Sequence, residues 1–258
     1  MYSALLVIIY LAFISLGLPD TLLGSAWPQM HIELNASLSS AGIITMIISM
    51  GTVISSLFSD RLNIKLGTGK VTAISVLMTA VALLGFSLSH SFIILCVLAV
   101  PYGLGAGAVD AALNNYVALH YSSKHMSWLH CFWGVGASIG PYIIGTCMAY
   151  GLGWRGGYSV ISVLQFTLTA ALFITLPLWK KVENSENNVI NGNNERTQEE
   201  PQERKAKSLS EVLHIKGVIY ILFAFFCYSA VEQTTTLWCA SYLVLNRSID
   251  SNIAAKLP

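Results

Sequence analysis

The sequence predicts an all-α integral membrane protein with six transmembrane helices, a polar linker and a seventh transmembrane helix. Hydrophobic residues make up 54% of the 258 residues and charged residues only 10%, whereas an ordinary soluble domain has roughly 25% charged residues. Seven apolar segments are long enough to cross a bilayer, which takes about 20 residues of helix. The net charge of +1 offers no basic face for nucleic acid. The expected surroundings are therefore the lipid bilayer, and nucleic acid is excluded as a partner.

The predicted spans follow one another with short connectors and one long polar interruption after the sixth. They cover residues 4–26, 38–58, 71–89, 92–116, 126–150, 157–179 and 217–244. The first span suits a retained helix better than a signal peptide, because no basic stretch precedes it and it contains Pro19 and Asp20. The expected organisation is a six-helix bundle over 1–180, a disordered linker rich in Asn and Glu over 181–215, and the seventh helix within 216–258.

Lysine and arginine residues predict the orientation, because short cytoplasmic loops carry an excess of them. Only Arg155, Arg247 and Lys256 fall on one side of the predicted spans. The other side carries Arg61, Lys65, Lys70, Lys124, Lys180, Lys181, Arg196, Arg204, Lys205, Lys207 and Lys216. We therefore expect a cytoplasmic N-terminus and linker in a multi-pass protein of the plasma membrane.

Cofactor and metal sites are not expected. The five cysteines lie in apolar stretches without CxxC spacing, so neither a zinc site nor a disulfide framework is indicated. The run Gly67-Thr68-Gly69-Lys70 resembles the end of a P-loop, but a valine follows it where a magnesium-binding Ser or Thr belongs. ATP-driven transport is therefore not supported.

Two acidic residues occur in a motif that appears twice in the predicted spans. Gly17–Leu23 and Gly107–Leu113 share the pattern Gly-x-x-Asp-x-x-Leu, which places Asp20 and Asp110 in helices that run in opposite directions. The predicted spans place Asp20 toward the outer half of its helix and Asp110 toward the inner half, as inverted repeats would. A carboxylate in a bilayer is costly and is a functional candidate by default, and low polarity favours its protonated form. We hypothesise that both acids exchange protons; alternatively, each forms a hydrogen bond worth about 1 kcal/mol to a neighbouring helix.

Two polar side chains accompany these acids. Glu232 lies in the seventh span and precedes Trp238 much as Asp20 precedes a tryptophan in the first span. Asn114 lies one helical turn after Asp110, where its amide could orient a solute hydroxyl or satisfy a buried partner. Both are candidate solute-binding residues, and a structural role is about equally well supported for each.

Histidine and aromatic residues complete the candidates. His130, near the cytoplasmic end of the fifth span, could bind solute and relay protons, or it could be a hydrogen-bonded packing residue. Aromatic side chains could stack on a sugar ring or anchor at the membrane interface. The candidates for these two roles are Trp27, Tyr102, Trp133, Tyr142 and Tyr228, and we interpret Trp27, Trp154 and Trp179 as interface anchors.

The loop after the second span carries a family resemblance. Ser56–Lys65 resembles the Gly-x-x-x-Asp-Arg-x-Gly-Arg-Lys signature of the major facilitator superfamily, with Asp60, Arg61 and Lys65 in place. The resemblance implies a twelve-helix carrier of two bundles, of which this chain supplies the first bundle and helix seven. It also implies a cytoplasmic gate at Asp60, Arg61 and Lys65, although a charge cluster that sets topology is nearly as good an explanation.

A narrower resemblance is to the fucose permease branch, the fucose-galactose-glucose:proton symporters. Asp20–Leu23, the stretch from Gly103 to Asn114, and the glycine-rich run Leu129–Pro141 are similar to that branch's motifs in helices one, four and five. This resemblance implies sugar and proton binding at Asp20, Asp110 and Asn114, with Asp110 in place of a glutamate.

These patterns favour a proton-coupled carrier that takes up a sugar or a similar small polar solute. A proton-driven drug or metabolite exporter of the same superfamily is the main alternative. A remote alternative is an intramembrane serine hydrolase, because Gly136–Gly140 matches G-x-S-x-G around Ser138. Since the second bundle is missing from this chain, we expect it to be inactive unless another chain completes it.

Overall fold

The computed structural model describes residues 2–194 and 213–257, and in these ranges it consists of helices joined by short turns, without strands. Seven helices in the described ranges are long and apolar enough to cross a membrane, which confirms the seven predicted spans. The helices are α1 (Tyr2–Asp20), α2 (Leu22–Glu33), α3 (Ser40–Leu66), α4 (Thr68–Leu88), α5 (Phe92–His120), α6 (Ser123–Ala149), α7 (Gly153–Asn194), α9 (Val218–Arg247) and α10 (Ser251–Ala254).

Three spans differ from their predicted limits, and in the second span α3 continues from the predicted end at residue 58 to Leu66. The first is built from two helices, because α1 ends at Asp20 and α2 continues to Glu33, beyond the predicted end at residue 26. The sixth span lies in α7, which continues to Asn194 where an irregular linker was predicted. Lysine and glutamate favour helix, and no proline or glycine follows Pro177 in the sequence until Gly192. Of the rest of the predicted linker, residues 195–212 lie outside the described residues.

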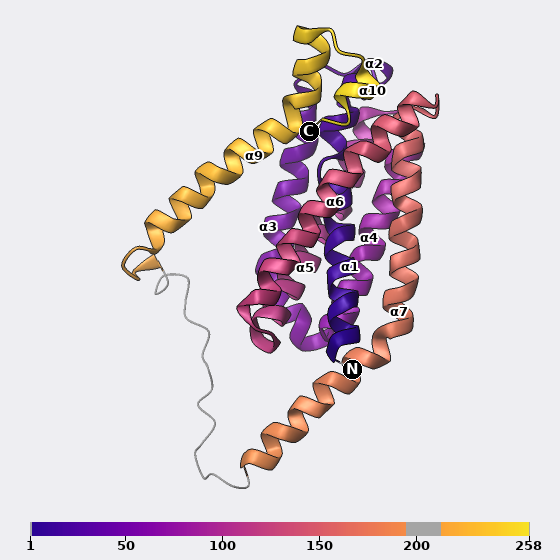
Figure 1. Cartoon of the computed structure of the whole chain (residues 1–258). Coiled ribbons are helices and arrows are strands. Elements are labelled where there is room, and N and C mark those ends of the chain that lie inside the picture. The colour runs from indigo at the N-terminus through magenta and orange to yellow at the C-terminus, as the bar shows by residue number, and fades with distance from the viewer. Residues whose placement is uncertain (1, 195–212, 258) are drawn as a thin grey trace.

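The contacts among the first six spans pair the helices of one three-helix unit with those of another. Helix α1 packs along α6, α3 packs along α5, and α4 packs along both α7 and α5 (Figure 1). If α1, α3 and α4 with their connections form one unit and α5, α6 and α7 the other, the α1–α6 and α3–α5 pairs correspond. The α4–α7 pair then corresponds to itself. This arrangement agrees with the inverted repeat that the shared motif predicts.

Glycines bring the paired helices into direct backbone contact. A Cβ atom added at Gly17 would collide with the backbone of α6 at Trp133, and one added at Gly107 would collide with the backbone of α3 at Thr52. These are the two motif glycines, so the repeated pattern marks the same close approach in both units. Small residues at helix contacts are the usual means of tight packing in membranes. Further close contacts of this kind occur at Gly51, Gly103, Gly136 and Gly140.

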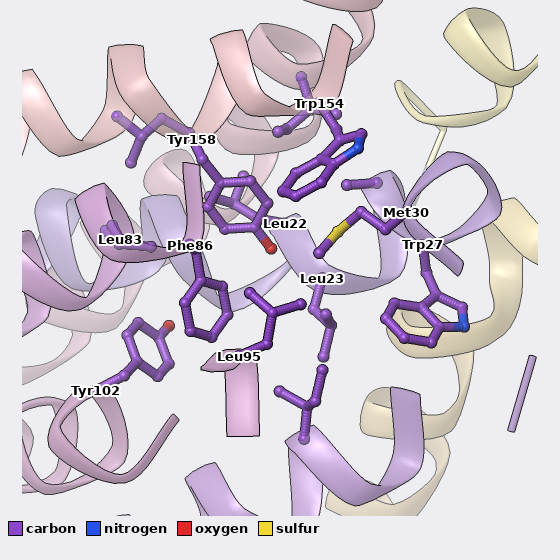
Figure 2. Packing of buried hydrophobic residues seen from close by; sticks show 14 of the residues in the cluster. Leu22, Leu23, Trp27, Met30, Leu83, Phe86, Leu95, Tyr102, Trp154 and Tyr158 are labelled. Atoms are coloured by element: carbon purple, nitrogen blue, oxygen red, sulfur yellow. The ribbon is translucent and has the colours of Figure 1, made fainter. Parts of the chain in front are cut away.

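The half of the bundle that contains α2 and the start of α7 has a core of aromatic and aliphatic side chains. Figure 2 shows Trp154 and Tyr158 facing Leu22 and Met30 of α2, with further core side chains alongside.

The interpretation of Trp27, Trp154 and Trp179 as interface anchors is wrong, because their exposed fractions are only 0%, 0% and 2%. A position near a helix end sets the depth of a tryptophan in the membrane, whereas packing of the helices decides which side it faces. Trp27 donates its indole N–H to the Leu38 carbonyl oxygen at 2.7 Å.

An arginine ties three parts of the bundle together at the same end. Arg155 forms an ion pair with Glu33 of α2 and donates to the Ser89 carbonyl oxygen, between α4 and α5, at 3.0 Å. Its guanidinium also lies 4.2 Å from the ring centroid of Trp154. The connections at this end are therefore held to the start of α7.

The seventh span contacts the bundle mainly through its second half. Helix α9 packs on α2 at Gly24, where an added Cβ would collide with the backbone at Thr236. Figure 1 shows the first half of α9 standing away from the other helices. Helix α10 folds back onto α6 beside Gly145.

Candidate functional site

Asp20 lies at the corner between α1 and α2. It is the last residue of α1, follows Pro19 and precedes Thr21, at which the helix is interrupted. All residues from 15 to 28 are buried except Asp20, which is exposed. The span runs from Ala4 to Glu33, so Asp20 lies close to its middle rather than in its outer half. The result is an accessible acid at mid-membrane depth.

Two neighbouring helices donate hydrogen bonds to this acid. Trp133 of α6 donates its indole N–H to Oδ2 of Asp20 at 2.8 Å, and the Tyr102 hydroxyl of α5 makes a longer contact of 3.5 Å with Oδ1. Beside them, the Thr21 hydroxyl donates to the Ala137 carbonyl oxygen of α6 at 3.0 Å. The corner of the first span is therefore attached to α5 and α6, which both belong to the second unit.

Asp110 is bonded within its own helix. The side-chain amide of Asn114 donates to Oδ1 of Asp110 at 2.9 Å and to its backbone oxygen at 3.0 Å. Both side chains are half-buried, and His130 of α6 is close enough for its charge to interact with that of Asp110. The His130 ring meets Phe13 edge-on, with 6.1 Å between centroids. The structure thus places Asn114 on Asp110 and His130 within electrostatic range of that acid, and a shared site stays a prediction.

The acids of different spans are also near one another. Asp20 is within the range of electrostatic interaction with Asp110 and with Glu232 of α9. Glu232 is half-buried, and its backbone oxygen accepts a hydrogen bond from the Thr236 hydroxyl at 2.9 Å. Asp20 is therefore the acid that connects the two motif positions with the seventh span.

The predicted gate residues lie apart from this site. Asp60, Arg61 and Lys65 are exposed in the last turns of α3, at the end of the bundle opposite to Arg155. The Arg61 guanidinium lies over the Phe58 ring, 5.9 Å from its centroid. The gate role of these residues stays a prediction.

The hydrolase alternative lacks its required geometry. Ser138 lies in the interior of α6 and donates to the Gly134 carbonyl oxygen at 2.9 Å. A nucleophile elbow needs a strand-to-helix turn, and the part of the chain described by the structure contains no strand. Among the same residues, no three His, Cys, Asp or Glu side chains converge as a metal site would require.

Sequence reasoning missed the partners of Asp20. Trp133 and Tyr102 were considered only as stacking or anchoring residues, and Gln165 of α7 was not considered at all. Gln165 is 1% exposed and bonds to Ser15, one turn before Pro19. A buried glutamine in an apolar span is itself an unusual feature, and that signal could have identified it.

Comparison with known proteins identifies the family. The sequence profile of the Major Facilitator Superfamily matches residues 9–254. The chain belongs to the Major Facilitator Superfamily. An uncharacterized transporter of Sinorhizobium fredii, y4wD, is 25% identical over 116 residues, which cover 44% of this chain and 31% of that protein. Synaptic vesicle glycoprotein 2B of Rattus norvegicus is 24% identical over 178 residues, which cover 66% of this chain and 26% of that protein.

This superfamily consists of transporters that carry small solutes across membranes, and membership of the chain in it favours a transporter over an enzyme. The chain spans less than a third of the length of these two relatives. Neither relative is described as a sugar permease, so the narrower resemblance to the fucose permease branch stays a prediction.

Proposed function

We propose that the chain forms part of a secondary transporter that takes up a small polar solute of the sugar class together with a proton. The observation that carries this proposal is Asp20, an exposed acid in the middle of a buried stretch, bonded by donors from two other helices. Intramembrane acids that face a bundle interior or a water-filled cavity mark ion and substrate pathways.

The side chains around Asp20 suit a polyhydroxylated solute. A carboxylate accepts hydrogen bonds from hydroxyl groups, and an asparagine side chain such as that of Asn114 can both donate and accept. Trp133 and Tyr102 add rings with polar edges beside the acid, which can lie against the apolar face of a sugar. Such a solute would compete with the Trp133 indole for the same carboxylate oxygen.

Protonation supplies the coupling in this proposal. A deprotonated Asp20 only accepts hydrogen bonds, whereas the protonated group also donates one, so its bonds to Trp133 and Tyr102 change with its proton. Those bonds link the first span to helices of the other unit. A proton on Asp20 therefore alters how α1 is attached to α5 and α6 within this bundle. In this proposal, that change biases how the bundle moves against the second bundle, which is the movement that underlies alternating access in transporters.

Uptake into vesicles tests this proposal. We expect labelled fucose or glucose to enter faster when the outside is acidic, in vesicles that contain the chain and a co-expressed second bundle. Asp110→Asn should lower this acceleration severalfold, because the amide keeps the bond to Asn114 but cannot release a proton. Asp250→Asn, an exposed acid before α10, is the matched control. Undiminished acceleration in Asp110→Asn rejects a coupling role for this residue, and solute leaving against the proton gradient identifies an exporter.

We further propose a plasma membrane location with a cytoplasmic N-terminus. The described lysine and arginine side chains support the orientation, because Arg61, Lys65, Lys70 and Lys124 lie at one end of the bundle, with Arg155 and Arg247 at the other. In a cysteine-free variant, an impermeant thiol reagent applied to intact cells should label Arg247→Cys and spare Lys124→Cys. If only Lys124→Cys were labelled, the protein would have the opposite orientation.

A further inference from the structure

Pro19 leaves one backbone carbonyl of α1 without its helical donor. In a helix, the N–H of residue i donates to the carbonyl of residue i−4, and proline has no N–H. The carbonyl deprived in this way is that of Ser15, a residue that is only 7% exposed. A buried carbonyl without a partner is costly, so another donor is required at this point of the bundle.

Gln165 of α7 supplies that donor. Its side-chain Nε2 donates to the Ser15 backbone oxygen at 2.5 Å, and the Ser15 hydroxyl donates to Oε1 of Gln165 at 2.8 Å. The amide therefore both replaces the missing proline N–H and holds the serine side chain. With 1% exposure, Gln165 has no access to solvent that could take its place.

This clamp, the pair of hydrogen bonds between Gln165 and Ser15, lies close to the corner that carries Asp20. A small cavity is lined by Ser15, Pro19, Gln165 and Tyr102. Tyr102 contacts Asp20, so the clamp and the acid share this neighbour. The position of the corner thus depends on contacts with three helices, namely α5, α6 and α7.

We propose that Gln165 is a positioning residue that fixes the Pro19 corner and thereby aligns the Asp20 carboxylate with the Trp133 indole. The functional meaning of this alignment rests on the proposed role of Asp20. The alignment itself is a structural property that can be measured without any transport assay.

Fluorine NMR of protein labelled with fluorotryptophan measures the Trp133 contact directly. The Trp133 resonance is identified by its loss in Trp133→Phe, and Asp20→Asn defines its shift when the acid is changed. Gln165→Met, which removes both bonds at similar volume, should shift this resonance, because the Trp133 indole and the Asp20 carboxylate would no longer be aligned. Thr169→Val is the matched control, because this buried hydroxyl of α7 bonds only to the Gln165 carbonyl oxygen of its own helix.

Restoring the missing N–H provides the deciding comparison. Pro19→Ala gives the Ser15 carbonyl a helical donor, so adding Gln165→Met to Pro19→Ala should move the Trp133 resonance less than Gln165→Met does alone. If Gln165→Met does not fold, the double variant should fold. An unchanged Trp133 resonance in a folded Gln165→Met protein, equal effects in both backgrounds, or failure of the double variant to fold overturns the proposal. If the vesicle assay showed no proton-coupled uptake at all, the proposed function would fail, but the NMR test of the Gln165 contact would keep its meaning.

Discussion

Replacing Gly136 with leucine is expected to leave little folded protein. A Cβ atom at this position would collide with the backbone carbonyl oxygen of Ile14 and crowd the backbone nitrogen of Leu18 in α1. Backbone atoms cannot turn away as a side chain can, so α1 and α6 must separate. Overpacking by a few atoms costs about 1–3 kcal/mol, and separation of these helices also disturbs the bond between Trp133 and Asp20. We expect Gly136→Ala to lower the melting temperature and Gly136→Leu to prevent folding.

Gly134 provides the matched control for this substitution. It lies two residues earlier in the same helix, and a Cβ atom added there meets no atom within 4 Å. Gly134→Leu should therefore melt close to the wild-type temperature, and Gly134→Ala should be neutral or slightly stabilising, since alanine favours helix over glycine. The measurement is thermal unfolding of the detergent-solubilised protein followed by size-exclusion chromatography. Equal losses at the two positions would show that the α1–α6 contact is looser than the structure indicates.

The seven spans could be predicted from the sequence because length and hydropathy alone decide them. The break at Thr21 could not, although Pro19 marks the place. Proline in a membrane helix bends, interrupts or leaves the helix intact depending on which neighbours satisfy the freed carbonyl. Here that neighbour is Gln165, which is 146 residues away from Pro19 in the chain, and no local pattern connects the two positions.

The acids of the site could be predicted for a similar reason. A carboxyl group inside an apolar segment stands out in any sequence. The repeat is less accurate on depth, because it places Asp20 in the outer half of its span whereas the structure places it near the middle. The partners of the acids are ordinary in sequence terms. Trp133 is one of six tryptophans, and only the packing of α6 on α1 distinguishes it from Trp27 and Trp154, which are buried elsewhere.

Asp20→Asn is expected to abolish the dependence of uptake on the proton gradient. Asparagine has the same size and keeps one oxygen that can accept from Trp133, so the corner between α1 and α2 should fold as before. The amide cannot bind or release a proton near neutral pH. In the vesicle assay, the acceleration of solute entry by external acid should fall at least about tenfold, which corresponds to roughly 1.4 kcal/mol of coupling. Asp250→Asn should retain the wild-type acceleration.

Trp133→Phe separates the role of the acid from that of its strongest donor. Phenylalanine keeps a ring in α6 but removes the indole N–H that lies 2.8 Å from Oδ2. If Asp20 carries the proton and Trp133 only positions the Asp20 side chain, the variant should keep proton coupling but bind solute more weakly. The weaker binding would be measured as a higher solute concentration at half-maximal uptake. If external acid still accelerates solute uptake by the Asp20→Asn protein, the proton is carried instead by Asp110 or Glu232, which both interact electrostatically with Asp20. The carboxyl at the helix corner would then serve to bind solute and to join the two units.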